Sequence, residues 1–194
     1  KINQNISKSY FLKKASFLAR LGSGSASRSI QGPIVSWGQS EFYNNSSQLF
    51  GTPLNKISEV FKSYQDSILI IDKKEKKISS SLGHELMESN PYAENRFFQA
   101  NKNMGIIKSI FSSGDVKNFI KIVESEALSL HAMMMTSYPS FILIKPNTLS
   151  VIDKVIKFRN STSVPICFTL DAGSNVHLLY PKINFNRVQS FIDS

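Results

Sequence analysis

Two short stretches of this sequence carry residues that could do chemistry. Residues 22–29 read Gly-Ser-Gly-Ser-Ala-Ser-Arg-Ser and surround one arginine, Arg28, with hydroxyls and small residues. Backbone amides in such a run can approach an anion closely, and a guanidinium can bind a phosphate or carboxylate through two parallel hydrogen bonds. Residues 169–175 place a single carboxylate, Asp171, after an apolar segment and just before Gly173. An anion-binding loop and a lone carboxylate are typical of an enzyme that acts on a phosphorylated acid.

Each stretch also has an ordinary structural interpretation. Arg28 could be a surface arginine that follows a helix, with the neighbouring serines filling a turn. Asp171 could simply initiate a hairpin, because aspartate favours turns and is followed here by Ala-Gly. The local sequence alone leaves both interpretations open.

Four motifs in order along the chain resemble those of the diphosphomevalonate decarboxylase family, which belongs to the kinase superfamily of galactokinase, homoserine kinase and mevalonate kinase. Residues 22–29 match the family pattern G-S-G-S-A-C-R-S except at Ser27, where the family has cysteine. Residues 169–175 match T-F-D-A-G-P-N except at positions 170 and 174. Residues 78–83 resemble V-S-S-T-x-G, and residues 130–132 resemble F-H-A. The resemblance extends from about residue 7 to the last residue.

The resemblance implies roles for particular side chains. Arg28 would bind the acid end of the substrate, and Asp171 would lie beside the substrate's tertiary hydroxyl as a catalytic base or orienting group. The remaining substrate-binding residues implied by the motifs are Ser23, Gly24, Ser25, Ser80 and Gly173. No protein metal site is expected.

Three of the matched positions keep structural alternatives or depart from the family. Ser80 is equally well suited to be the N-cap of a following helix. His84 stands where the family more often has methionine, which changes the packing expected beside the substrate. His131 lies in an apolar helical pattern, where a histidine is more often a core residue than a catalyst, although the family match favours a supporting role behind the substrate contacts.

The activity implied by the resemblance is ATP-dependent decarboxylation of (R)-mevalonate 5-diphosphate to isopentenyl diphosphate, a step of isoprenoid biosynthesis that uses ATP and Mg²⁺. The expected partner is this small substrate, with no nucleic acid and no membrane; a homodimer is left open. The family's ATP phosphate loop is absent from the sequence, so we expect a fragment that is inactive alone. The alternatives are a mevalonate-type kinase, a monophosphate decarboxylase, or a non-catalytic domain.

Composition is compatible with these expectations. The chain has 194 residues, of which 41% are hydrophobic, and a formal net charge of +9. No apolar run approaches the ~20 residues that span a bilayer, and the single cysteine, Cys167, excludes an internal disulfide framework. The lysines occur mostly in short runs mixed with acidic residues, which favours a solvated basic surface over a nucleic-acid site. A cytoplasmic location is the simplest prediction.

The residue pattern predicts an α+β fold. Helical periodicity covers residues 7–21, 80–90, 92–112, 115–136 and 148–160, a short helical turn lies near 59–61, and a closing helix begins near 184. Strand-like segments cover residues 33–37, 67–71, 140–144, 164–170 and 175–180, with 67–71 expected to be buried on both faces. Residues 38–55 are expected to be a loop at a domain boundary.

The resemblance divides the chain further. Residues 1–50 would be the remnant of a ribosomal-S5-like N-terminal domain that carries the substrate-binding loop. Residues 51–65 would be a linker, and residues 66–194 a ferredoxin-like C-terminal domain with an antiparallel sheet and helices. The active site would lie between the two domains.

Overall fold

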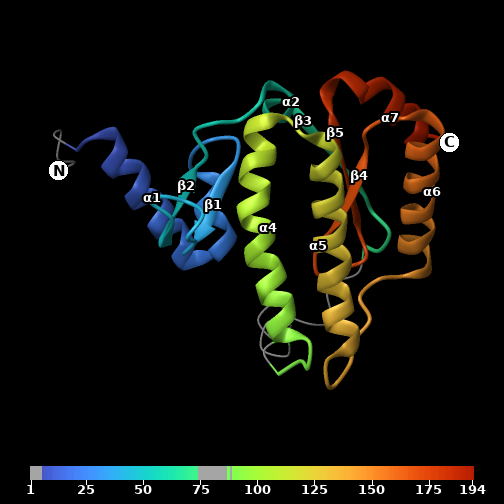
Figure 1. Ribbon diagram of the computed structural model, residues 1–194, viewed down its shortest axis with the longest axis horizontal. Coiled ribbons are helices and arrows are strands. Elements are labelled where there is room, and N and C mark those ends of the chain that lie inside the picture. Colours follow the sequence, from blue (N-terminus) through green and yellow to red (C-terminus); the bar gives the residue numbers. More distant parts are fainter. Residues whose placement is uncertain (1–5, 74–86, 88) are drawn as a thin grey trace. The chain divides into compact units, whose positions relative to one another are not determined.

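A computed structural model of the chain describes residues 6–73, 87 and 89–194 (Figure 1). The chain divides into two compact units, residues 1–57 and residues 58–194. The division falls inside the segment 51–65 that the sequence predicted to be a linker. The assignment of the two parts to an S5-like remnant and a ferredoxin-like domain stays a prediction.

The first unit consists of a helix, a 3₁₀ turn and a hairpin. Helix α1 (Lys8–Gly22) begins at Ser7, whose side chain accepts a hydrogen bond from the amide of Tyr10. It is followed by the 3₁₀ helix η1 (Gly24–Ser29) and by the antiparallel pair β1 (Val35–Gly38) and β2 (Ser47–Pro53). The helix over 7–21 and the strand over 33–37 are confirmed.

The loop predicted over residues 38–55 is wrong in its second half, which forms β2. The serines and asparagines that favoured a loop close the hairpin turn instead. Ser46 Oγ accepts from the amide of Ser40 at 3.0 Å and donates to the carbonyl of the same residue at 2.9 Å. This pair of hydrogen bonds brings the chain back along β1 and allows the next seven residues to form a strand.

The second unit contains an antiparallel three-stranded sheet in the order β3-β5-β4. After the short helix α2 (Glu59–Lys62) comes β3 (Tyr64–Leu69); β4 (Cys167–Leu170) and β5 (Val176–Pro181) form the predicted hairpin. In the ladder, His177 of β5 lies opposite Ile68 of β3 on one side and opposite Thr169 of β4 on the other.

Four longer helices follow among the described residues of this unit. Helices α4 (Ala93–Ser113) and α5 (Val116–Thr136) lie side by side in Figure 1, joined through Gly114, which has a φ of 80°. The N-cap of α5, Asp115, accepts a hydrogen bond through its side chain from the amide of Asn118 at 3.0 Å. Helix α6 (Pro146–Thr162) follows, and the 3₁₀ turn η2 (Lys182–Asn184) leads into α7 (Phe185–Ile192). These helices confirm the predicted ones, with ends that differ by at most two residues.

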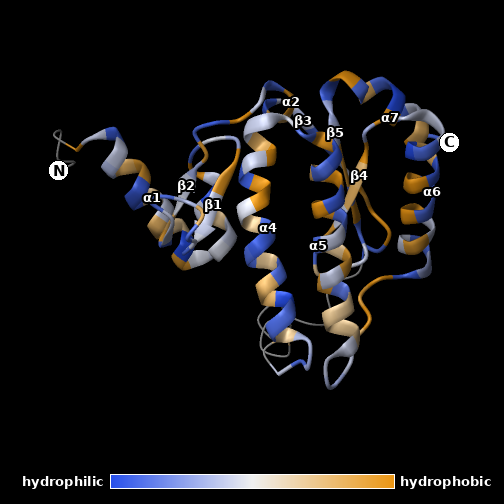
Figure 2. Cartoon of the chain, in the orientation of Figure 1, coloured by the Kyte–Doolittle hydropathy of each residue, from blue (hydrophilic) through white to orange (hydrophobic). Residues whose placement is uncertain are grey.

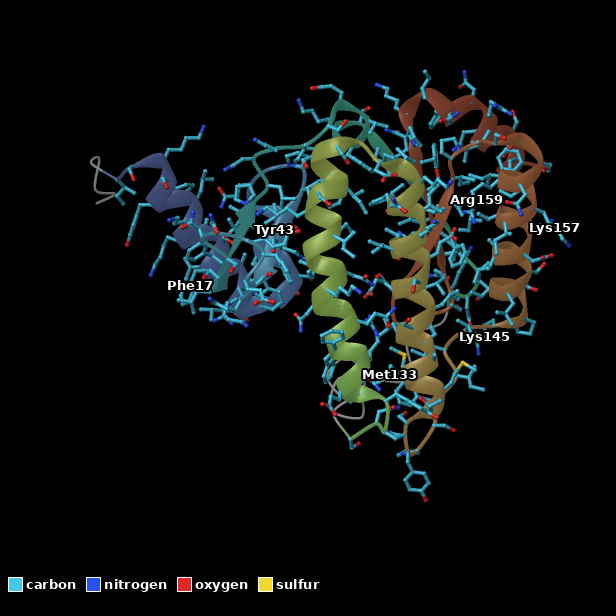
Figure 3. The ribbon with its side chains drawn as sticks, in the orientation of Figure 1. Phe17, Tyr43, Met133, Lys145, Lys157 and Arg159 are labelled. Atoms are coloured by element: carbon cyan, nitrogen blue, oxygen red, sulfur yellow. The ribbon has the colours of Figure 1, made fainter. Side chains whose placement is uncertain are left out.

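The strands form the main apolar core with residues of α5, α6 and α7, and β4 is correspondingly apolar in Figure 2. Tyr180 is fully buried there, and its hydroxyl is bonded to Ser67 Oγ at 2.7 Å and to Gln189 Nε2 of α7 at 3.0 Å. At the edge of this core, Arg159 of α6, labelled in Figure 3, pairs with Glu124 of α5 at 2.6 Å. The core residues contributed by the strands are Phe168, Leu170, Val176, Leu178 and Tyr180.

Two strand predictions in this unit need correction. The segment over 67–71 is an edge strand and its continuation, so it is not buried on both faces: Ile68 is 52% and Ile70 is 57% exposed. Residues 140–144 form irregular chain instead of a strand. The amide of Phe141 donates to the carbonyl of Met134 at the end of α5, which holds this segment against the helix.

The helix predicted over 80–90 lies largely outside the described residues. The α+β class with antiparallel sheets is confirmed. Within the described ranges, every helix is too short or too polar to span a lipid bilayer.

Candidate functional site

The arginine loop of the first unit is fixed by one buried hydroxyl. Ser16, fully buried in α1, donates through Oγ to the carbonyl of Ser27 at 2.6 Å and accepts from the amide of Gly51 in β2 at 2.9 Å. Ser27 is also fully buried, and its Oγ donates to the carbonyl of Gly24 at 2.8 Å. The serine that replaces the family's cysteine therefore holds the loop closed by an internal hydrogen bond.

Close packing explains why the loop begins with glycine. A Cβ atom at Gly24 would lie 2.7 Å from the ring of Trp37, and a Cβ at Gly51 would lie 2.8 Å from the carbonyl oxygen of Ser27. The indole of Trp37 is itself held by a hydrogen bond from its Nε1 to the carbonyl of Gln48 at 3.0 Å. The backbone of η1 thus lies directly on the β1–β2 hairpin.

The polar side chains of this loop point outward. Ser23 Oγ and Ser25 Oγ are 3.2 Å apart and exposed. Arg28 is exposed, and its guanidinium makes no hydrogen bond or ion pair with the residues that the structure describes. A charged fork and two hydroxyls on a rigid turn can bind an anion without first breaking an internal ion pair.

The carboxylate loop of the second unit, residues 171–175 between β4 and β5, is held by several side chains. The carbonyl of Asp171 accepts from the amide of Gly173 at 2.6 Å and contacts Nε2 of His131, on α5, at 3.1 Å. Thr148, fully buried in α6, donates through Oγ1 to the carbonyl of Ser174 at 2.7 Å. Asn175 Oδ1 accepts from the amides of residues 71 and 72 at 2.9 and 3.1 Å.

Thr148 connects this loop to the start of α6. Its Oγ1 also accepts from the amide of Lys145, which Figure 3 labels just before the helix, at 3.1 Å. One hydroxyl therefore caps the helix and holds the loop. As a result the backbone around Asp171 is rigid, while its side chain remains 81% exposed and available to a ligand.

His131 supports the loop from the core. Its ring is buried, and burial lowers its pKa; the hydrogen bond to the carbonyl of Asp171 opposes this shift with a smaller effect. A neutral imidazole results, and Nε2 must carry the proton because a carbonyl oxygen only accepts. His131 is thus a structural support for the Asp171 backbone, as the sequence favoured.

A second histidine, His177, lies near the carboxylate of Asp171. His177 Nδ1 contacts both carboxylate oxygens of Asp66 on β3, at 3.1 and 3.0 Å. Its other nitrogen, Nε2, lies 4.0 Å from Oδ2 of Asp171. The side chain of His177 is 21% exposed and that of Asp66 is 46% exposed, so the imidazole is the most buried of the three groups.

The predicted site residues therefore form two groups. Ser23, Gly24, Ser25 and Arg28 come together in and beside η1 of the first unit. Asp171 and Gly173 come together in the β4–β5 loop of the second unit, and Ser80 and His84 lie outside the described residues.

Sequence reasoning missed the residues that position these groups: Ser16, Asp66, Thr148, Asn175 and His177. Only Asn175 was inside a quoted motif, and it was given no role.

These observations describe an α+β protein with a hydroxyl-rich arginine loop in its first unit and an exposed carboxylate in the β4–β5 loop of its second unit. The chain belongs to the family described as the mevalonate 5-diphosphate decarboxylase C-terminal domain, whose model matches residues 67–194. Three of the four motifs lie inside this range and residues 22–29 precede it, and the recognition of the family from its motifs is confirmed.

Individual relatives agree with this family. The chain is 26% identical over 185 residues to a diphosphomevalonate decarboxylase of Candida albicans, covering 93% of this chain and 50% of the relative. It is 27% identical over 105 residues to a phosphomevalonate decarboxylase of Haloferax volcanii, covering 52% of this chain and 32% of the relative. The crystal structure of mevalonate diphosphate decarboxylase from Staphylococcus aureus superposes with a TM-score of 0.82 at 27% identity, over 93% of this chain and 54% of that one. The chain thus spans half or less of the curated relatives described here.

Proposed function

We propose that these residues form the C-terminal part of an ATP-dependent diphosphomevalonate decarboxylase. The reaction converts (R)-mevalonate 5-diphosphate and ATP to isopentenyl diphosphate, ADP, phosphate and carbon dioxide. The observation that carries the proposal is the Asp171 loop. Its backbone is fixed by hydrogen bonds from α5, α6 and the segment after β3, while its carboxylate stays exposed in a family-matched domain.

Asp171 is proposed to act on the substrate's 3-hydroxyl. A tertiary alcohol is a weak acid, so phosphoryl transfer to it benefits from a carboxylate that accepts its proton or orients its oxygen. Departure of the new phosphate then builds positive charge at C3. Loss of carbon dioxide supplies the electron pair that forms the alkene, so the carboxylate need only act in the first step.

Arg28 is proposed to bind the acid end of the substrate. Its guanidinium has no competing partner among the described residues, and the buried Ser16 and Ser27 hydroxyls fix the backbone that carries it. The exposed hydroxyls of Ser23 and Ser25 can donate to the same anion. Gly24 keeps this turn close to Trp37, and Gly173 and Ser80 keep the substrate-contact roles that the motifs imply.

ATP enters this proposal as a co-substrate, accompanied by Mg²⁺. Among the described residues there is no group of three or more histidine, cysteine, aspartate or glutamate side chains that could hold a metal ion. The metal would be bound largely through the nucleotide phosphates, as is usual for Mg²⁺.

A second candidate substrate is mevalonate 5-phosphate. The observation that favours it is the similarity to the phosphomevalonate decarboxylase of Haloferax volcanii, which covers about half of this chain. A mevalonate-type kinase would make ADP without carbon dioxide, and a non-catalytic domain would make neither. Homodimer formation and a cytoplasmic location stay predictions.

The test is a product assay on the native polypeptide that contains these residues. ADP and carbon dioxide are measured together with ATP, Mg²⁺ and either the diphosphate or the monophosphate of mevalonate. We expect equal amounts of both products from the diphosphate and a loss of turnover on the order of 100-fold or more in Asp171→Asn. Asp153→Asn is the matched control, because among the described residues this exposed carboxylate pairs only with Lys157 of the same helix.

Because the Asp171 side chain is mostly exposed, Asp171→Asn should unfold like the wild type. Near-normal turnover by this variant would contradict the role proposed for Asp171. ADP without carbon dioxide would identify a kinase, and a preference for the monophosphate would identify the second candidate.

A further inference from the structure

Two carboxylates, those of Asp66 and Asp171, lie on either side of the His177 imidazole. Asp66, His177 and Asp171 come from β3, β5 and the β4–β5 loop, so the strand ladder brings them together from distant parts of the sequence. Asp66 contacts Nδ1, and Asp171 faces Nε2. Each nitrogen of the imidazole therefore faces a different carboxylate.

Asp66 fixes the protonation pattern of the neutral ring. An ionised carboxylate can only accept, so the Nδ1 atom that contacts Asp66 carries the hydrogen. The other nitrogen, Nε2, then has a free lone pair, and it is this nitrogen that lies 4.0 Å from Oδ2 of Asp171. This distance is too long for a hydrogen bond, but a side-chain rotation of Asp171 or one bridging water closes such a gap.

We propose that His177 accepts the proton that Asp171 takes from the substrate hydroxyl, an inference that rests on the proposed function. The O–H bond of the substrate breaks as a bond forms between its hydrogen and Oδ2 of Asp171. The same hydrogen then passes to Nε2 of His177. The ring becomes an imidazolium whose Nδ1–H remains bonded to the ionised Asp66, and Asp171 is again a carboxylate.

The alternative route for this proton is directly to water. Asp171 is 81% exposed in the chain described here, and a free carboxylic acid loses its proton rapidly to solvent. A bound substrate must approach the carboxylate, however, and it removes water from the exposed side. His177, on the sheet side, is then the base that remains within reach.

The other described groups near His177 are not suited to accept a proton from the Asp171 carboxyl group. Its ladder partners, Ile68 and Thr169, cannot titrate in the relevant range. His131 contacts the backbone carbonyl of Asp171 and not its carboxylate, and burial lowers its pKa. Among the described residues, the titratable groups that face the His177 ring are Asp66 and Asp171.

The first test uses the 194-residue chain itself and needs no activity. Nitrogen-15 NMR of the histidine side chains at a pH where His177 is neutral distinguishes the two tautomers. We expect the Nδ1–H form in the wild type and a mixture of both forms in Asp66→Ala. An Nε2–H form in the wild type would overturn the inference, because that nitrogen could not then accept a proton.

The second test measures turnover in the native polypeptide. His177→Asn keeps a donor at the position of Nδ1 but has no second nitrogen, so it separates the Asp66 hydrogen bond from the proton acceptor. We expect kcat to fall by on the order of 100-fold, with the KM for mevalonate 5-diphosphate unchanged. We also expect added imidazole to restore part of the activity of His177→Ala.

The outcomes separate the two proposals. If the wild type makes no ADP and carbon dioxide, the proposed function fails, and the inference fails with it. If the wild type is active and His177→Asn has normal kcat, the proton leaves to water and only the inference about His177 is wrong. A fall in kcat that imidazole does not restore, or that comes with an equal rise in KM, would indicate a structural role.

Discussion

Replacement of Thr148 by valine exchanges a hydroxyl for a methyl group of similar size. This small change is expected to destabilise the second unit strongly. The side chain is fully buried, and its hydroxyl serves the carbonyl of Ser174 at 2.7 Å and the amide of Lys145 at 3.1 Å. The Ser174 carbonyl is partly buried, and leaving such a group without a donor costs about 1–3 kcal/mol. Loss of a helix cap adds about 1 kcal/mol. We therefore expect the free energy of unfolding to fall by about 2–4 kcal/mol.

The measurement is urea denaturation of the chain, followed by circular dichroism. Thr148→Ser is the matched variant, because it keeps the hydroxyl and removes one buried methyl group, which costs about 1 kcal/mol. Thr169→Val is the control for the exchange itself, since the Thr169 hydroxyl makes no hydrogen bond with described residues. If Thr148→Val is no more destabilised than Thr148→Ser, the two hydrogen bonds do not hold the loop.

Two further expectations concern the supports of the site. Gly24→Ala should lower the free energy of unfolding of the first unit by about 1–3 kcal/mol in thermal melts, because the new methyl group would lie 2.7 Å from the Trp37 ring. Gly22→Ala is the control and should be neutral, because a Cβ there would have no atom within 4 Å. Equal effects of the two substitutions would contradict the packing argument. The lowered pKa of His131 means that the unfolded chain binds a proton more readily, so this group should cost stability as the pH falls below about 6.5. His131→Gln keeps a donor toward the carbonyl of Asp171 but cannot titrate. Between pH 7 and pH 5, its free energy of unfolding from urea titrations should fall less steeply than that of the wild type. An unchanged slope of this free energy against pH would contradict the role assigned to the His131 pKa.

Local signals in the sequence were sufficient for most elements. The helices have apolar residues at helical spacing and, at Asp115, a side chain suited to cap the first turn. The β4–β5 hairpin follows from Asp171 and Gly173 between two apolar strands. The segment over 140–144 is equally apolar but forms no strand, because an apolar run does not determine whether a partner strand lies beside it.

The candidate site could be predicted only in part for the same reason. Arg28 and Asp171 were found because they stand inside short motifs that survive in this sequence. The contact of Asp66 with His177 joins residues 111 positions apart and depends on β3 pairing with β5, which no local pattern reveals. Ser16 was equally hidden, since a serine on a helix is ordinarily a surface residue and only the fold shows that it is buried.

The hydroxyl of Ser16 also provides a way to follow the arginine loop in solution. It accepts from the amide of Gly51, 35 residues away, while donating to the carbonyl of Ser27 in the loop. The amide hydrogen of Gly51 can exchange with deuterated solvent only when this connection opens. The exchange rate of the Gly51 amide therefore reports the opening of the arginine loop, although Gly51 lies in β2 and outside that loop. If a bound anion tightened the loop, this amide would exchange more slowly.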